Sequence, residues 1–514
     1  MYPIDFFFRA ARHFGERVAI EAPEGTLSYA ELAARVNAAA AGLQQLDPQP
    51  GSRVGICAGN TRDHVVALLA VLAAGKVWIP LNPRSAPAEL DRIVAFTQPG
   101  IVLATAKYGA ALALGAVPQR VALDQAFEGT PQTFAELIDR HAGESPTRVE
   151  RADTDLQAIK FTGGSTGVPK GVMQSIRAWR ATVLNLIDAY GFGEGDRNLL
   201  AAPITHGAGT YLLPVLAKGG AHVILAETNA HTVLDALTQG GISNVFMPPT
   251  LFYMVMEAGA DTNATFPALR HLIYGGAPMP VEKIRAAQRF FGPVVEVTYG
   301  QTEAPQIVAF LNGRDLADDR YVHSVGRASL LSDFAIMGAN GALLGAGETG
   351  EIVVRGQMIM NGYLDMPEKT AETIVDGWLH TGDLGYLDED GYLFLRGRSR
   401  DVIITGGFNV YPVDVEDVLG RHPHVQDVAV FGVADDKWGE AVTAAVQLKR
   451  DTQRGTELEG VPDEATLMAW AKAQLGAVKT PKRIHFHETL PRNPVGKVDK
   501  VLLKSRHGAA EDVA

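Results

Sequence analysis

The stretch RVGICAGNTRDHVVALLAVLAAGKVWIPL, residues 53–81, decides the fold because it alternates between two kinds of apolar pattern. Residues 53–57 and 76–81 are short apolar runs typical of buried strands, whereas residues 62–74 are long enough for a buried helix. A strand, a helix and a second strand in this order indicate a parallel βαβ unit whose sheet is covered by helices. The apolar run 65–75 is too short to span a bilayer.

The same alternation continues toward residue 300. Short apolar runs separated by helix-length segments predict strands at 198–203, 221–226, 244–249, 269–276 and 294–300. We therefore expect an α/β protein with a large N-terminal domain of parallel, helix-covered sheets. Ligands of such folds bind at the carboxyl ends of strands, which favours a site near the polar segments that follow these runs.

The pattern changes after about residue 325. Short strands and tight turns follow, with GEIVVRG at 350–356 and an Asp390-Gly391 pair that indicates a hairpin. We expect a small antiparallel, barrel-like region here. After GRSRD (397–401) the sequence predicts a smaller α+β unit with a helix near residues 464–475.

Composition excludes several classes of protein. Acidic residues outnumber basic ones by 58 to 46 among the 514 residues, a net charge of −12, which argues against a nucleic-acid surface. The single cysteine, Cys57, excludes an internal disulfide and a cysteine-rich zinc site, and fits a reducing compartment. Asp5 and Arg9 interrupt the apolar run within the first 14 residues, so this segment lacks the uninterrupted apolar region of a signal peptide. We expect a cytoplasmic protein without a transmembrane segment.

The segment FTGGSTGVPKG, residues 161–171, is rich in glycine and hydroxyl side chains. Glycine allows close backbone approach, and exposed N–H groups suit an anion, so a phosphate is the expected guest. The segment is not a Walker A loop, because Lys170 follows Pro169 and precedes Gly171 instead of Ser or Thr. A flexible surface loop is the alternative interpretation.

Together with four further stretches in the same order, this loop resembles the adenylate-forming superfamily, in its acyl-CoA synthetase branch. The superfamily also includes luciferase-like enzymes and peptide-synthetase adenylation domains. The stretches are YGGAPM (274–279), YGQTE (299–303), GWLHTGDLGYLDEDGYLFLRGRSRD (377–401) with GGFNVYP (406–412), and PRNPVGKVDK (491–500). The resemblance covers nearly the whole chain, and the order of the motifs makes it specific.

The resemblance implies an AMP-forming ligase that uses ATP, Mg²⁺ and coenzyme A as co-substrate. A carboxylate first attacks the α-phosphate of ATP, which gives an acyl-AMP and pyrophosphate, and a thiol then displaces AMP. It also implies an N-terminal AMP-binding domain at 1–397, a hinge at 398–400 and a mobile C-terminal domain at 401–514 that carries the catalytic lysine. Because an anion approaches a polyanionic nucleotide, fixed donors and cations must offset the repulsion.

The resemblance also assigns the nucleotide-binding residues. Thr302 contacts the α-phosphate, and Glu303 holds Mg²⁺, which prefers carboxylate and phosphate oxygens. Asp383 binds both ribose hydroxyls, and Arg398 also reaches the ribose. The other assigned residues belong to the phosphate loop (Thr162, Gly163, Gly164, Ser165, Thr166, Gly167 and Lys170) and to the adenine site (Gly275, Gly276, Ala277, Tyr299 and Gly300).

Lys497 is implied as the catalytic lysine that bridges the attacking carboxylate and the nucleotide. His206 caps the acyl pocket and interacts with the carboxylate. Arg400 matches the hinge position, about which the small domain swings after adenylation, and Gly407 then lines a pantetheine tunnel. Three positions depart from the common pattern: Gly163 replaces a serine, Arg400 an aspartate or lysine, and Phe408 a glutamate.

Structural interpretations remain open for several of these residues. Lys170 and Lys497 can each be solvated lysines in a loop, and Glu303 a surface carboxylate after a strand. Residues 275–277 can be a turn that ends a strand, and His206 a structural histidine under the sheet.

The acyl pocket determines the substrate. By resemblance its walls come from 203–213, 247–252, 274–276 and 300–307, and the small residues at 207–209 leave room for a bulky or long chain. We expect a medium- or long-chain fatty acid first, and an aromatic or alicyclic acid second. The next hypothesis is a stand-alone acyl-AMP ligase that loads a carrier protein. The last is a non-catalytic nucleotide-binding relative. The partners are small molecules, with a homodimer possible.

Overall fold

The computed structural model describes residues 1–162, 170–449, 460–493 and 497–508. The predicted strand, helix and strand of residues 53–81 are present as β3 (Arg53–Cys57), α3 (Arg62–Ala73) and β4 (Val77–Pro80). Strands β3 and β4 pair in parallel, and α3 is buried from His64 to Leu72. The Thr61 side chain caps the helix by accepting a hydrogen bond from the backbone N–H of His64.

These strands belong to the first of three sheets. Its strands are, in spatial order, β19 (Gly362–Tyr363), β9 (Lys170–Ser175), β8 (Leu156–Thr162), β4, β3, β5 (Ile101–Ala104), β6 (Gln119–Ala122) and β7 (Gln132–Thr133). Strand β8 runs parallel to β4, while β9 turns back antiparallel to β8. The predicted phosphate loop therefore connects β8 to β9, although residues 163–169 lie outside the described residues.

The second sheet combines the predicted parallel strands with the predicted antiparallel region. Its order is β17 (Ser332–Met337), β18 (Gly350–Gly356), β21 (Trp378–Leu387), β22 (Leu393–Arg398), β16 (Ser324–Ala328), β15 (Ala309–Leu311), β14 (Val295–Tyr299), β13 (His271–Gly275), β12 (Asn244–Met247), β10 (Arg197–Leu199), β11 (Ala221–Val223), β1 (Val18–Glu21) and β2 (Leu27–Ser28), with β20 (Ile374–Val375) beside β21. Strands β12, β13 and β14 are parallel, whereas β14 to β18, β21 and β22 pair antiparallel. Gly391 turns the predicted hairpin with φ +78°.

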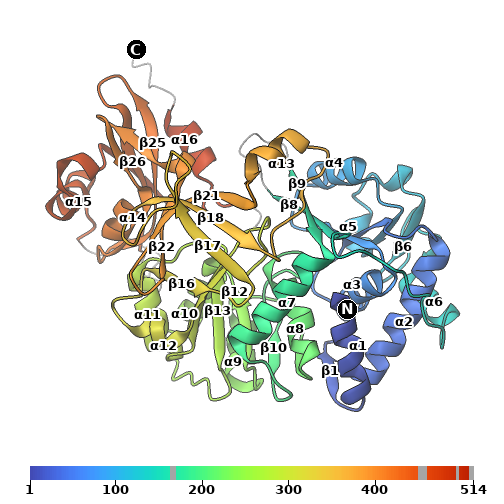
Figure 1. Cartoon of the computed structure of the whole chain (residues 1–514). Helices are drawn as coiled ribbons and strands as arrows, with labels where there is room; N and C mark the ends of the chain where they lie inside the picture. The colour runs from blue at the N-terminus through green and yellow to red at the C-terminus, as the bar shows by residue number, and fades with distance from the viewer. Residues whose placement is uncertain (163–169, 450–459, 494–496, 509–514) are drawn as a thin grey trace.

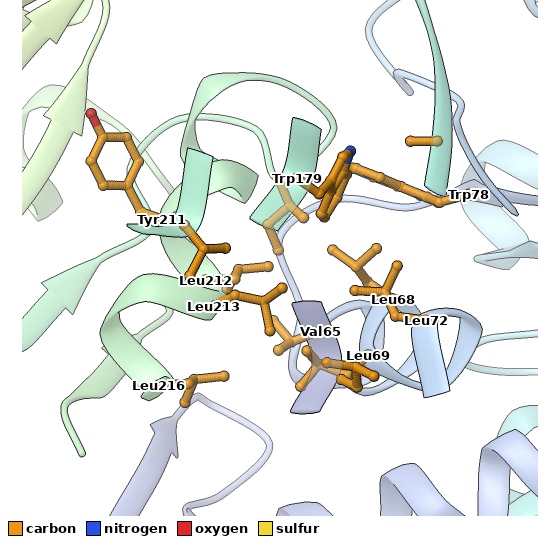
Figure 2. Close-up of a cluster of buried hydrophobic side chains, with 14 of the residues drawn as sticks. Val65, Leu68, Leu69, Leu72, Trp78, Trp179, Tyr211, Leu212, Leu213 and Leu216 are labelled. Carbon is orange, nitrogen blue, oxygen red and sulfur yellow. The ribbon is translucent and has the colours of Figure 1, made fainter. Parts of the chain in front are cut away.

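Helices cover both sheets (Figure 1). They are α1 (Pro3–His13), α2 (Tyr29–Leu46), α4 (Pro87–Thr97), α5 (Ala106–Gly109), α6 (Phe134–Arg140), α7 (Ile176–Tyr190), α8 (Leu212–Ala217), α9 (Ala230–Gln239), α10 (Pro249–Ala258), α11 (Val281–Phe291), α12 (Gly313–Ala317) and α13 (Pro367–Thr373), in addition to α3. The largest buried cluster joins α3, β4, α7 and α8, and Figure 2 shows Leu68 and Leu72 of α3 near the indoles of Trp78 and Trp179. The two sheets thus share one apolar core.

A third sheet forms the C-terminal unit, which lies at one end of the molecule in Figure 1. Its strands are β24 (Phe408–Val410), β23 (Ile403–Thr405), β26 (Gly439–Leu448) and β25 (Val425–Asp435), with β27 (Arg483–His487) beside β26 and helices α14 (Pro412–Gly420), α15 (Glu464–Lys479) and α16 (Lys500–Gly508). Strand β22 of the second sheet ends at Arg398, and β23 begins at Ile403, so the chain crosses between the sheets at 399–402. In the described ranges, no helix is both long and apolar enough to cross a membrane.

The shared core predicts a large stability effect for Leu68→Ala. Leu68 is 1% exposed, so the substitution removes buried apolar surface and leaves a cavity. We expect the free energy of unfolding in urea to fall by about 2.7–5 kcal/mol. The control is Leu330→Ala, at a leucine that is 65% exposed, and equal effects of the two substitutions would contradict the role of this core.

Candidate active site

The ends of β13 and β14 bring two predicted motifs side by side. Gly275 pairs with Thr298 across the two strands, so 274–279 and 299–303 leave the sheet at the same edge. A Cβ at Gly275 would lie 2.8 Å from the carbonyl oxygen of Thr298, whereas Gly276 has φ +80° and open space around it. The first glycine is therefore required by strand packing, and the second leaves an open backbone surface. Ala277 follows in the same turn.

Asp383 of β21 is held by three donors. The Tyr299 hydroxyl donates to its Oδ2 at 2.8 Å, and Gln301 Nε2 donates to the same oxygen at 2.6 Å. Arg398 Nε lies 3.3 Å from Oδ1, because β21 and β22 pair these two residues directly. Burial, and then the neighbouring Asp383 charge, raise the pKa of Tyr299 well above its ordinary value. Tyr299 therefore stays a neutral donor.

The loop after Tyr299 also contacts the first sheet. The Tyr363 hydroxyl donates to Glu303 Oε1 at 2.8 Å, and Gln174 Nε2 donates to the backbone oxygen of Thr302 at 2.8 Å. Lys170 Nζ lies 5.2 Å from the centre of the Tyr363 ring. Lys170 is the first residue of β9 and the last residue assigned to the predicted phosphate loop, so the structure brings Lys170 and 299–303 to the two sides of Tyr363.

The predicted phosphate loop is only partly described. Thr162 ends β8, and Lys170 begins β9. Gly163, Gly164, Ser165, Thr166 and Gly167 lie outside the described residues. Gly300, in the second motif, is required by packing because a Cβ there would lie 2.9 Å from the backbone nitrogen of Gln306.

The carboxylate of Glu303 fits the predicted magnesium ion. Within the described ranges, no group of three or more histidine, cysteine, aspartate or glutamate residues forms a cage for a metal ion. Mg²⁺ at nucleotide sites is held by one or two carboxylates together with phosphates and water. One oxygen of Glu303 accepts a hydrogen bond from the Tyr363 hydroxyl, which holds the carboxylate in one orientation and leaves its other oxygen for the ion.

Lys497 reaches the same cleft from the C-terminal unit. Removal from water lowers the pKa of its ammonium, Arg398 lowers it further, and Asp383 opposes both effects. The Lys497 side chain nevertheless remains accessible to solvent. Its backbone N–H donates to Asn493 Oδ1 at 3.0 Å. Arg492 donates to Thr250 Oγ1 of α10 at 3.2 Å.

His206 is a neutral imidazole near several cations. Burial first, and then repulsion from Lys160, Arg84 and Lys497, together lower its pKa to about 4. Its Nδ1 lies 3.0 Å from Thr205 Oγ1. Lys497 therefore lies within electrostatic range of both His206 and Asp383.

The space beside residues 207–209 is already filled, so the expectation of room for a long chain there is wrong. A Cβ at Gly207 would lie 2.6 Å from Cε1 of Phe246, and one at Gly209 would overlap the carbonyl oxygen of Ile204. The small residues allow close packing. Tyr211 stacks on Phe246 with ring centres 5.5 Å apart. The adjoining cavity has about 20 Å³ and is lined by Gln174, Trp179, Thr182, Val183, Gly209, Thr210, Leu213 and Pro305.

The predicted hinge and tunnel residues lie on short turns. Arg400 is part of the 3₁₀ turn Ser399–Asp401, with its Nε 3.7 Å from Asp401 Oδ1. Gly407 has φ +82° and open space on its Cβ side, between β23 and β24. The neighbouring Phe408 is 60% exposed.

Several residues of this site were not predicted from the sequence. Gln174, Tyr363 and Phe246 contribute through contacts with residues far away in the chain, and no local pattern marks them. Gln301 had a weak signal, because it is a polar residue inside the motif 299–303.

Comparisons with known proteins identify the family of this chain. The AMP-binding enzyme family matches residues 7–364, and the AMP-binding enzyme C-terminal domain matches residues 414–497. A feruloyl-CoA synthase from Amycolatopsis sp is 34% identical over 97% of this chain and 98% of its own length. The medium/long-chain-fatty-acid–CoA ligase FadD8 of Mycobacterium tuberculosis is 34% identical over 68% of this chain and 61% of its own length. The structure of the amide bond synthetase McbA from Marinactinospora thermotolerans has a TM-score of 0.88 and 32% identity, and the match covers 99% of this chain and 100% of McbA.

These matches extend over most of the chain and both of its sequence regions. The enzymes of this branch join acids to coenzyme A at the expense of ATP. The chain therefore belongs to the AMP-binding enzyme family, in the CoA ligase branch of the adenylate-forming superfamily, and is an AMP-forming acid–thiol ligase.

Proposed function

We propose that this enzyme activates a ring-containing carboxylic acid with ATP and transfers the acyl group to coenzyme A. One observation carries the proposal of two-step chemistry. Lys497 of the C-terminal unit lies within electrostatic range of Asp383, Arg398 and His206 of the large unit. A cation that moves with a separate unit can serve one half-reaction and leave for the next.

The nucleotide would bind along the edge where the two sheets meet. Asp383 would receive the ribose hydroxyls, with Arg398 beside it, and a carboxylate suits two adjacent hydroxyl donors because each oxygen accepts one. The open backbone at Gly276 would support the adenine, with Tyr299 on its other side. The phosphates would lie between Thr302 and the loop that ends at Lys170. Mg²⁺ at Glu303 would neutralise phosphate charge.

The first half-reaction requires two anions to meet. A carboxylate oxygen attacks the α-phosphorus, the bond to the bridging oxygen breaks, and pyrophosphate carries away the electron pair. The ammonium of Lys497 would stabilise the charge that develops between the acid and the nucleotide. His206, a neutral ring at ordinary pH, would offer a hydrogen bond without a competing charge. In the second half-reaction, a thiol attacks the acyl carbonyl and AMP departs.

We further propose that residues 398–400 form the hinge, with domains at 1–397 and 401–514. The observed orientation is the one that serves adenylation, because Lys497 lies in the cleft. After rotation about Arg400, the turn that contains Gly407 would line the path of the pantetheine arm. The open side of Gly407 supports this role, because a backbone without a side chain permits close approach.

The acyl pocket favours an aromatic or alicyclic acid over a long fatty acid. Its cavity of about 20 Å³ has room for about one water molecule, so the acid must displace neighbouring side chains. A flat ring can stack against Tyr211 or Phe246, as these rings already do with each other. The relatives include ligases of both kinds, because the feruloyl-CoA synthase matches over 98% of its own length at 34% identity and the long-chain-fatty-acid–CoA ligase FadD13 of Mycobacterium tuberculosis over 93% at 30%. The packing of the pocket therefore carries the proposal.

A panel of acids tests the substrate class. We expect benzoate, cinnamate or cyclohexanecarboxylate to give a higher kcat/KM than acetate, hexanoate or palmitate, because the pocket is compact and aromatic. Release of pyrophosphate and of AMP would be measured with and without coenzyme A. A preference for palmitate would contradict the ring-acid proposal, and AMP release that ignores coenzyme A would indicate another acceptor, such as a carrier protein.

Replacement of Lys497 tests the two-step proposal. We expect Lys497→Ala to lower acid-dependent pyrophosphate exchange by at least about 100-fold, because charge stabilisation in the transition state is lost. Conversion of supplied acyl-AMP and coenzyme A to product should change much less. The control is Lys500→Ala, three residues away, which removes an ion pair with Glu416. Equal losses in both half-reactions would contradict the proposed division of roles.

Removal of the hydrogen bond to Glu303 tests the magnesium site. We expect Tyr363→Phe to raise the Mg²⁺ concentration needed for half-maximal pyrophosphate exchange by about tenfold, the effect of losing a hydrogen bond to a charged group. Tyr321→Phe is a matched control, because Tyr321 donates to Asp390 in the distant hairpin. An unchanged Mg²⁺ requirement in Tyr363→Phe, measured also by Mg²⁺-dependent binding of ATP, would exclude the orienting role.

A further inference from the structure

Lys160 is a buried cation that the proposed mechanism does not use. It lies on β8, two residues before Thr162, and is 8% exposed. Its Nζ is 5.1 Å from the ring centre of Trp78 and 5.5 Å from that of Trp179. The two indoles meet edge to face with their centres 5.9 Å apart. Both side chains are labelled in Figure 2. Both aromatic faces attract the ammonium.

No acid compensates this charge. Within the described part of the chain, Lys160 has no ion pair and no hydrogen-bond acceptor for its ammonium, and burial alone lowers its pKa to about 8. The lysine is therefore still mostly protonated at pH 7. A buried, unpaired ammonium is costly, and cation–π contacts offset only part of that cost. A lysine would be hard to retain here unless a bound molecule supplied the missing acceptor.

The position of Lys160 points to the acyl side of the active site. Its charge lowers the pKa of His206, so the ammonium lies within electrostatic reach of that ring. Trp179 belongs both to the lysine cage and to the wall of the 20 Å³ cavity. The indole N–H of Trp179 donates to Gln174 at 3.0 Å, and Gln174 also lines this cavity. The cage therefore adjoins the space that the acid must enter.

We propose that Lys160 is a specificity-determining residue that pairs with an oxygen acceptor on the acid, remote from the carboxylate that reacts. This inference rests on the proposed function, because it extends the substrate of the same site. The acceptor is either a second carboxylate or a phenolic oxygen, and both place a negative or strongly accepting oxygen at the ammonium. When an acid without such an oxygen occupies the pocket, the ammonium of Lys160 has no acceptor.

A site with a buried ammonium rejects an acid that lacks the second oxygen more strongly than a purely apolar pocket would. A site built to hydrogen-bond a substrate group discriminates strongly against analogues without it, because the buried protein group then loses its partner. Discrimination should also depend on pH. Because Lys160 is charged below about pH 8, the preference should be present at pH 7 and should fall as the pH rises through about 8.

Matched pairs of acids test the inference: 4-hydroxycinnamate with cinnamate, terephthalate with benzoate, and adipate with hexanoate. The measurements are kcat/KM in pyrophosphate exchange and the Kd of each acid by calorimetry. We expect the enzyme to prefer the oxygenated member of at least one pair by about tenfold or more. In Lys160→Met, the ratio within that pair should fall by a similar factor, and Lys160→Arg should restore part of it. A preference within the cinnamate pair would indicate a phenolic oxygen as the acceptor. A preference within either of the other two pairs would indicate a second carboxylate.

Lys107→Met is the matched control, because Lys107 also lies over an aromatic ring, that of Tyr108 at 5.3 Å, but its side chain is exposed. Equal losses for both members of every pair in Lys160→Met would overturn the inference and indicate a structural or general role. The absence of any preference in the unmodified enzyme would overturn it as well. Failure of exchange with every acid would instead contradict the proposed function, and the calorimetric ratios would then decide the role of Lys160.

Discussion

The loop of residues 299–303 is held by hydrogen bonds from two sheets, and the geometry of the rest of the site depends on it. On one side, Tyr299 and Gln301 donate to Asp383 of β21. On the other side, Gln174 donates to the backbone of Thr302, and Tyr363 donates to Glu303. The backbone N–H of Met360 also donates to the carbonyl of Glu303 at 2.8 Å. A loop tied at so many points has little freedom, which is the condition for precise placement of charge.

Charge is concentrated locally in a chain that is acidic as a whole. The net charge of −12 repels a polyanionic nucleotide at long range. Around the site, burial is the main cause that lowers the pKa values of Lys497 and His206, and the nearby cations Arg398 and Lys160 add to it. Neutral His206 follows from this arrangement, because burial and nearby cations both disfavour its protonation. The protein therefore attracts anions by short-range contacts and not by its overall field.

The sequence predicted the fold better than it predicted the walls of the acyl pocket. Periodicity placed β3, α3 and β4, and the motif order identified the family, because both signals are local in the chain. The small residues at 207–209 were misleading for the opposite reason. Their neighbours Phe246 and the carbonyl of Ile204 fill the space, and a sequence does not show which distant group occupies a gap. Gln174 and Tyr363 escaped notice for the same reason.

The domain orientation was also beyond the sequence, and its contacts explain how it can change. Arg396 of β22 lies 3.1 Å from Asp414 of α14, and His323 lies 3.6 Å from Asp417 of the same helix. Burial raises the pKa of Asp417 to about 6 and lowers that of His323 below its ordinary value, and both shifts weaken the attraction between the two groups. Partly exposed ion pairs each contribute about 0–1 kcal/mol. A few such contacts select an orientation without locking it, which is what the hinge proposed at 398–400 requires.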